Sequence, residues 1–148
     1  MTAQASWTLR VGVDLVAVDE VAASVRRFGD RYVDRIFTPH EIAVCRATDA
    51  PEVPDGARRA YSAESLAARF AAKEAVVKVL RPREARPDWR SIEVHRMAGG
   101  WCEIRLSGRA AELAAAAGID EFAVSLTHEA PVAAAVVVGR CADRPREE

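Results

Sequence analysis

The chain has 148 residues, of which 50% are apolar and 29% charged, and a formal net charge of -1 at pH 7. A chain of this length can bury a core of its own, so we expect residues 1–148 to form a single domain. The near-zero net charge excludes a general attraction to nucleic acid or to an anionic membrane, so any binding of anions must depend on local clusters. Aromatic residues make up only 6% of the chain, and no stripe of basic and aromatic residues indicates binding to single-stranded nucleic acid.

The cysteines and the N-terminal sequence indicate where the protein works. Cys45, Cys102 and Cys141 lie far apart and form no Cys-x-x-Cys pair, which argues against a disulfide framework and against a zinc site. The N-terminal segment lacks the basic start and apolar stretch of a signal peptide, and no apolar run approaches the roughly 20 residues that span a bilayer. We therefore expect a soluble, cytoplasmic protein with no membrane partner.

The first third of the chain predicts one strand followed by short helices. Residues 7–18 are rich in Val and Leu and predict a buried strand, in which Asp14 is the one charge that looks buried. Helical spacing of apolar residues follows, and Thr38, Pro39 and Glu41 form a helix start with a capping box. The predicted helices cover residues 20–28, 32–37 and 39–47.

The rest of the chain predicts a long helix, a hairpin and a closing pair of strands. Residues 49–59 are rich in turn-forming residues and predict an exposed loop or insertion. Ser62 caps a helix that Pro82 ends, and residues 81–90 form an irregular loop. Next come a hairpin of strands 91–96 and 101–106, a helix over 109–117, strands over 122–126 and 132–138, and a loose tail from about residue 140. This order predicts an α+β fold with a largely antiparallel sheet covered by helices on one face.

The helix segment at 67–78 is where we expect the chemistry. It places Arg69 and Lys73 one turn apart on one stripe and Glu74 and Lys78 on the neighbouring stripe, while its alanines keep the backbone closely approachable. Several cations and one carboxylate on a narrow wall are well suited to binding phosphate and metal. The alternative is a solvated face, on which Glu74 and Lys78 form an ordinary surface ion pair.

Asp14 and His128 are the candidates outside this helix. An unpaired carboxylate near the end of an apolar strand is costly to bury, so Asp14 needs a cation, water or a role as cap of the next helix. With Glu74 it forms a candidate pair of ligands for Mg²⁺, which takes one or two carboxylates and completes its shell with phosphates and waters. His128 lies in a turn between two strands, where a structural hydrogen bond is the alternative to a functional role.

Three segments in this order resemble the holo-acyl-carrier-protein synthase type of 4'-phosphopantetheinyl transferase. They are Val-Gly-Val-Asp-Leu-Val at 11–16, Arg-Phe-Ala-Ala-Lys-Glu-Ala-Val-Val-Lys at 69–78, and Val-Ser-Leu-Thr-His at 124–128 with the strand that follows. Similarity also runs through residues 35–41 and 106–111, so it covers most of the chain between positions 9 and 139. The spacing matches the short, single-unit members of the family.

The resemblance implies the single-unit 4'-phosphopantetheinyl transferase fold. It implies transfer of the phosphopantetheine arm of coenzyme A to a serine of an apo acyl carrier protein, with release of adenosine 3',5'-bisphosphate. Asp14 and Glu74 would hold Mg²⁺ on the pyrophosphate and act in catalysis together with Lys73. The coenzyme A phosphates would be bound by Arg69, Lys73, Lys78 and His128. The base that takes the serine proton is either a carboxylate at the metal or a metal-bound water. Members of this size are usually homotrimers with sites between subunits.

This chain departs from the family pattern at three places. Glu20 stands where the family often has a basic residue that grips the carrier, so docking would instead use Arg26, Arg27 or Arg31. The loop at 81–87 lacks the family's glycine, which affects the expected adenine site, and Gly-Gly-Trp-Cys at 99–102 replaces a Gly-x-Pro turn. Two other hypotheses therefore stay open: a non-catalytic module that binds coenzyme A or a carrier protein, and a Mg²⁺-dependent hydrolase of another pyrophosphate.

Overall fold

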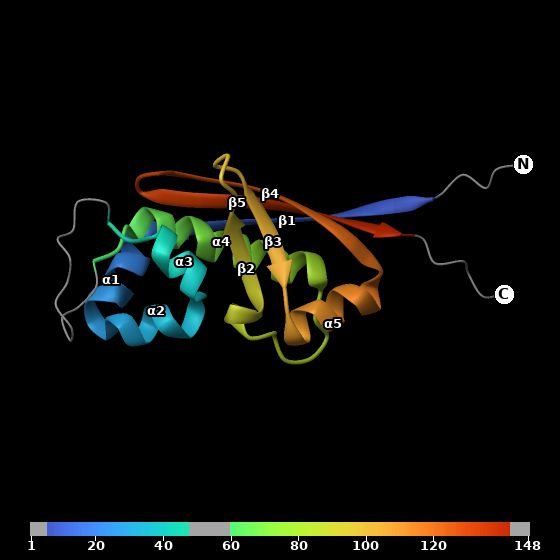
Figure 1. Ribbon diagram of the computed structural model, residues 1–148, viewed down its shortest axis with the longest axis horizontal. Helices are drawn as coiled ribbons and strands as arrows, with labels where there is room; N and C mark the ends of the chain where they lie inside the picture. The colour runs from blue at the N-terminus through green and yellow to red at the C-terminus, as the bar shows by residue number, and fades with distance from the viewer. Residues whose placement is uncertain (1–5, 48–59, 143–148) are drawn as a thin grey trace, which may run out of the picture.

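The computed structural model describes residues 6–47 and 60–142, which form an elongated α+β arrangement (Figure 1). The expected insertion at 49–59 lies outside these residues. The last strand extends to Ala142, so residues 140–142 belong to a strand and not to the expected tail. None of the helices within the described ranges is long and apolar enough to cross a membrane.

The strands form two antiparallel sheets instead of one. Strands β1 (Trp7–Ala17), β5 (Val132–Ala142) and β4 (Ile119–Glu129) make a three-stranded sheet in the order β1-β5-β4. Its register pairs Val13 with Val136, and Val136 in turn with Ser125. The predicted hairpin, β2 (Ile92–Arg96) and β3 (Cys102–Leu106), forms a separate two-stranded sheet. The expected antiparallel character is confirmed.

The helices begin where the sequence predicts, within two residues. Thr38 and Glu41 exchange side-chain and backbone hydrogen bonds in the predicted capping box, and the side chain of Ser62 accepts a hydrogen bond from the backbone of Ser65. The third helix is shorter than expected and ends at Val44. The helices are α1 (Val18–Phe28), α2 (Asp30–Ile36), α3 (Pro39–Val44), α4 (Ala63–Leu80) and α5 (Gly108–Ala117), with a 3₁₀ turn η1 at Trp89–Ser91.

Helix α4 is the central element, because it packs along one face of the three-stranded sheet and 12 of its residues are buried. Strand β1 approaches it closely at Gly12, where a Cβ would lie 2.1 Å from the carbonyl oxygen of Ala75. Only a residue without a side chain allows this contact. Arg69 and Lys73 are among the buried residues, and Glu74 pairs with Arg86, so the alternative of a solvated face with a Glu74–Lys78 pair is wrong.

The opposite face of the same sheet has no cover from the described residues. Leu9, Val11, Val13 and Leu15 point outward from β1 and are between 51% and 69% exposed. Val136 on β5 lies beside them and is also exposed. The prediction of a buried strand is therefore wrong for the single chain, because helices cover only one face of the sheet and alternate residues of β1 face solvent.

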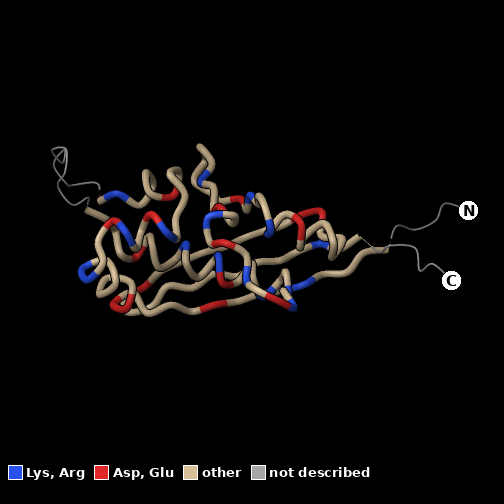
Figure 2. Tube along the Cα trace, turned by 90° about the horizontal axis from the view of Figure 1, so that it is seen from below, with Lys and Arg blue, Asp and Glu red and all other residues tan. Residues whose placement is uncertain are grey.

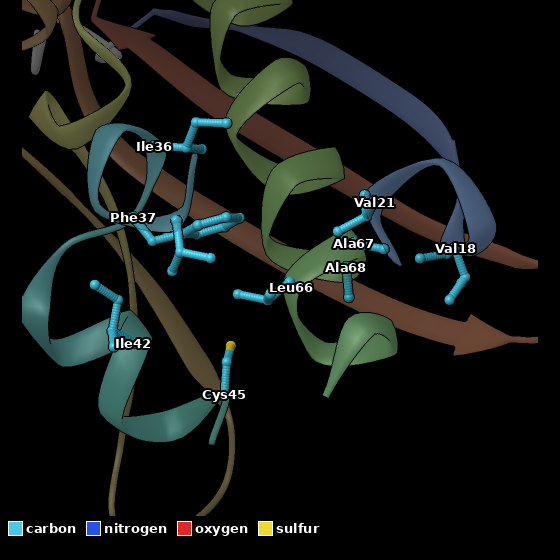
Figure 3. Close-up of a cluster of buried hydrophobic side chains, with 11 residues drawn as sticks. Val18, Val21, Ile36, Phe37, Ile42, Cys45, Leu66, Ala67 and Ala68 are labelled. Atoms are coloured by element: carbon cyan, nitrogen blue, oxygen red, sulfur yellow. The ribbon is translucent and has the colours of Figure 1, made fainter. Parts of the chain in front are cut away.

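The helical end of the molecule has a core of its own. Val21, Phe37, Ile42 and Leu66 meet where α1, α2 and α3 pack against the first turns of α4 (Figure 3). Burial of these apolar side chains fixes the short helices against α4. Basic and acidic positions are interspersed along the described part of the trace (Figure 2), so local groups decide where anions bind.

Candidate functional site

The first group of site residues lies where β1 crosses α4. Strand and helix run in opposite directions, since Arg10 donates a 3.1 Å hydrogen bond to the carbonyl of Val79 while Gly12 lies against Ala75. The next residue of β1 that faces the helix is Asp14. A step of two residues along a strand covers about 6.6 Å, about the same length as four residues of an α-helix. The backbone of Asp14 therefore lies beside α4 about one turn closer to the N-terminus of the helix than Ala75 does.

Lys78 fixes the side of the helix on which the Asp14 carboxylate lies. Its Nζ is 3.2 Å from Oδ1 of Asp14 and donates a 2.7 Å hydrogen bond to the carbonyl of Val13. Glu74 precedes Lys78 by one turn, so both project from the same side of α4. The predicted residues Asp14, Glu74 and Lys78 therefore share one wall, and the cap role for Asp14 is excluded because Ala17 is the N-cap of α1.

Both carboxylates of this wall keep contact with solvent. The Asp14 and Glu74 side chains are 20% and 21% exposed, and each pairs with a more exposed cation. The partner of Glu74 is Arg86, whose Nη1 lies 3.4 Å from Oε2, and not Lys78. Exposed ion pairs of this kind are worth about 1 kcal/mol or less, so their cations can leave. Two accessible carboxylates fit the protein share of a Mg²⁺ site, and no cluster of three or more His, Cys, Asp or Glu occurs among the described residues.

Lys73 faces the protein interior, although it precedes Glu74. The side chain is 0% exposed, and its Nζ lies 2.7 Å from Oε1 of Glu41. It also donates hydrogen bonds to the carbonyl oxygens of Trp89 and Ile92. All three hydrogens of the ammonium group therefore have partners inside the protein. Lys73 has no donor left for coenzyme A in this arrangement, so the predicted direct contact of Lys73 with the coenzyme is wrong for this structure.

Glu41 is the partner that the sequence did not reveal. It is 0% exposed and accepts hydrogen bonds from the backbone of Thr38 at 2.9 Å and of Val94 at 3.0 Å, besides the contact with Lys73. Burial lowers the pKa of the Lys73 ammonium below its usual value, and the Glu41 carboxylate opposes this shift. The buried pair ties α3, α4 and β2 together beside Glu74. The sequence indicated Glu41 only as part of the capping box, in which one of its two carboxylate oxygens accepts a hydrogen bond from the backbone of Thr38. That motif gives no sign of the contact with Lys73.

The second group of site residues lines a cavity of about 350 Å³ between the first half of α4, the tip of the β2–β3 hairpin and β4. Arg69 is 6% exposed, and its Nη1 donates to the carbonyl of Ser65 at 3.1 Å, whereas its buried Nε has no hydrogen-bond partner. His128 lines the same cavity, with Nδ1 lying 3.3 Å from Oε2 of Glu64. The structure thus brings the predicted Arg69 and His128 together. Arg96, Trp101 and Cys102, which were not predicted, also line this cavity.

The two groups are carried by one helix. Arg69 lies in the cavity, while Glu74 and Lys78 follow about one and a half and two and a half turns later on the wall shared with Asp14. A ligand with phosphates at both places would therefore extend along α4. The Gly-Gly turn at 99–100 could have indicated that Arg96 and Trp101 line the same site, because the turn places the end of β2 beside the start of β3.

Comparisons of the sequence with known proteins identify the family of the chain. The sequence model of the 4'-phosphopantetheinyl transferase superfamily matches residues 10–136. Holo-[acyl-carrier-protein] synthase of Moorella thermoacetica is 41% identical over 130 residues, covering 88% of this chain and 92% of the relative. The corresponding protein of Desulforudis audaxviator is 41% identical over 133 residues, covering 88% and 93%.

Solved structures with the same fold include complexes with the coenzyme. The ACPS-CoA complex of Chronobacterium ammoniagenes has a TM-score of 0.72 at 28% identity and covers 93% of this chain and 99% of its own. Holo-[acyl-carrier-protein] synthase of Helicobacter pylori in complex with coenzyme A has a TM-score of 0.69 at 27% identity, covering 88% and 99%. The chain therefore belongs to the 4'-phosphopantetheinyl transferase superfamily, as a single-domain enzyme of its holo-[acyl-carrier-protein] synthase type.

Proposed function

We propose that the protein transfers the 4'-phosphopantetheine group of coenzyme A to a serine hydroxyl of an apo acyl carrier protein, with Mg²⁺, and releases adenosine 3',5'-bisphosphate. The observation that carries this proposal is the sequence of groups along α4. A cavity with the buried cation Arg69 is followed, about one and a half turns later, by the accessible carboxylate of Glu74, and the carboxylate of Asp14 on β1 lies on the same side of the helix. Coenzyme A carries phosphates at two separate places, and the helix offers binding groups at two separate places.

Asp14 and Glu74 are the proposed Mg²⁺ ligands. When bound there, the ion would polarise the attacked phosphorus and neutralise charge on the leaving group. Lys78 and Arg86, which pair with the two carboxylates, would become free to donate hydrogen bonds to phosphate oxygens. Lys73 has a positioning role in this proposal, because its buried pair with Glu41 fixes the turn of α4 from which Glu74 projects.

Arg69 and His128 are the proposed ligands of the coenzyme A phosphate in the cavity. A buried guanidinium with an unused N–H has a strong requirement for an acceptor. A phosphate group supplies such an acceptor and a compensating charge. The contact of His128 with Glu64 is solvent-exposed, so the imidazole can turn to the same phosphate.

A homotrimer is part of the proposal. The outer apolar face of the sheet, formed by Leu9, Val11, Val13, Leu15 and Val136, is larger than the scattered apolar residues usual on a monomer surface. Further copies of the same chain are its proposed cover, with sites between neighbouring subunits. Cys45, Cys102 and Cys141 are free thiols, as in a reducing cytoplasm, which is the proposed location.

The test of the function is a panel of apo carrier proteins from fatty-acid, polyketide and peptide synthesis. Each is incubated with the protein, coenzyme A and Mg²⁺, and intact mass is measured. We expect at least one carrier to gain one phosphopantetheine group, and the variant with its serine replaced by alanine to gain none. Binding of coenzyme A without any mass change would favour the non-catalytic module. Product formation from another pyrophosphate without a carrier would favour the hydrolase.

A further inference from the structure

A second cavity, of about 310 Å³, lies at the helical end of the molecule, between α2, α3 and η1. It shares no lining residue with the cavity that contains Arg69, and none of its lining residues belongs to the proposed metal or coenzyme A site. Its volume is at the lower end of the range usual for small-molecule sites. The size therefore suits a small ligand that the proposed function does not include.

Part of the lining of this cavity is a buried apolar surface. Phe37 is 0% exposed and Ile42 is 7% exposed, and both belong to the core of the helical end. Pro39 and Ala43 of α3 add two more apolar groups that are exposed. Removal of such a surface from water is favourable, so the lining favours a ligand with an apolar body.

Two arginines beside this apolar surface have side chains without partners. Arg46 and Arg90 are exposed, and within residues 6–47 and 60–142 neither guanidinium forms a hydrogen bond or an ion pair. Asp34 is the one acidic residue among the described residues that line the cavity, so two arginines and one aspartate give the lining a net charge of +1. An anion therefore complements the charge of the cavity.

The backbone holds the two arginines on different elements. Arg46 follows α3 and pairs with Tyr61 in an antiparallel bridge. Arg90 lies in η1, where its backbone N–H donates a 2.8 Å hydrogen bond to the side chain of Asp88, the N-cap residue. A ligand bound by both guanidinium groups would therefore join the end of α3 to η1.

A carboxylate on an alkyl chain satisfies both parts of the lining. Each of its two oxygens can accept hydrogen bonds from one guanidinium, while its chain covers Phe37 and Ile42. A phosphate would instead place unpaired oxygens against this apolar surface, which is costly. A stable protein contact buries about 800 Å² on each partner, which a concave site of this size does not by itself provide.

We propose that this cavity binds a small monocarboxylate with an alkyl chain. Arg46 and Arg90 hold the carboxylate, and Phe37 and Ile42 contact the chain. The inference goes beyond the proposed function and does not depend on it, because the cavity is separate from the groups that would bind coenzyme A and Mg²⁺.

The site lies next to the groups that hold Lys73. The ammonium group of Lys73 is 5.7 Å from the centre of the Phe37 ring and donates a 2.9 Å hydrogen bond to the carbonyl of Trp89, the residue before Arg90. The other partner of Lys73 is Glu41 of α3. A carboxylate that joins α3 to η1 therefore stabilises both elements that fix Lys73 in the interior.

The experiment is an NMR titration of the full chain, labelled with ¹⁵N, with octanoate. A ligand with about ten non-hydrogen atoms should bind with a Kd of about 0.2–5 mM, with saturable shifts at the amides of Phe37, Ala43, Trp89 and Arg90. Octylammonium has the same chain with the opposite charge, and acetate has the charge without the chain. Both should bind at least about 5-fold more weakly at these amides. Equal affinity for octanoate and octylammonium would overturn the proposal, as would equal affinity for octanoate and acetate.

Three variants with one arginine replaced test the two guanidinium groups. Arg46→Gln and Arg90→Gln should each bind octanoate about 3- to 10-fold more weakly. Arg83→Gln is the matched control, because Arg83 is exposed and lines neither cavity, and it should bind octanoate like the wild type. Wild-type affinity in both Arg46→Gln and Arg90→Gln would overturn the proposal. A rise in KM for the carrier in these two variants, without saturable octanoate shifts in the wild type, would also overturn it and assign the cavity to a protein partner.

Discussion

Replacement of Lys73 by methionine removes one partner of a buried ion pair while keeping the length of the side chain. Glu41 would remain 0% exposed with hydrogen bonds from the backbone of Thr38 and Val94, but without the cation 2.7 Å from its Oε1. Breaking a buried pair in this way costs about 3–5 kcal/mol, because an uncompensated charge is left inside. For a chain of this size that corresponds to a fall in Tm of roughly 6–20 °C.

The assay is thermal and urea unfolding of Lys73→Met beside two further variants. Lys78→Met removes the same side chain from an exposed pair with Asp14 and should cost about 1 kcal/mol or less. The double variant Lys73→Met/Glu41→Gln removes both charges and keeps a side-chain oxygen that can accept a backbone hydrogen bond, so it should recover part of the loss. A Lys73→Met protein as stable as Lys78→Met would refute the reasoning.

Three further predictions concern the carrier, the assembly and a buried thiol. Arg27→Glu reverses a charge at the basic, exposed end of α1. It should raise KM for the acidic carrier about 3- to 10-fold and leave the affinity for coenzyme A unchanged. An unchanged KM for the carrier would show that the carrier does not dock at Arg27. Val13→Asp should convert trimers to monomers in sedimentation velocity, because it places a charge on the outer apolar face, and an intact trimer would exclude that face as the interface. Burial raises the pKa of the Cys45 thiol to about 11, with smaller opposing effects of nearby charges. Because the unfolded thiol ionises first, the stability difference between wild type and Cys45→Ala should be constant below pH 9 and should fall between pH 9 and about 11, whereas a flat difference would contradict the raised pKa.

Local signals explain why most elements could be predicted from the sequence. Ser62 and Pro82 bound α4, Thr38 and Glu41 mark the start of α3, and the glycines at 99–100 mark the hairpin. Each of these signals acts over a few residues, so the chain alone carries it. The same is true of the grouping of Glu74 and Lys78, which follows from helical spacing.

Long-range packing explains what the sequence did not reveal. The interior placement of Lys73 depends on Glu41, which lies on another helix, and alanines on every side of α4 leave its buried stripe undefined. The exposed residues of β1 look like core residues because apolar composition alone does not tell whether another element covers a face, and the cover proposed for this one is another subunit. The split into two sheets depends on pairing between strands that are far apart in the chain.

The central claim is that Asp14 and Glu74 jointly hold a divalent ion beside the coenzyme A phosphates. The most direct measurement is the affinity of Mg²⁺ for the coenzyme A complex of the wild type, Asp14→Ala, Glu74→Ala and the double variant. The account predicts that each single variant loses at least about 100-fold in Mg²⁺ affinity and that the double variant loses little more, since the two ligands act as one site. Wild-type Mg²⁺ affinity in either single variant would contradict it.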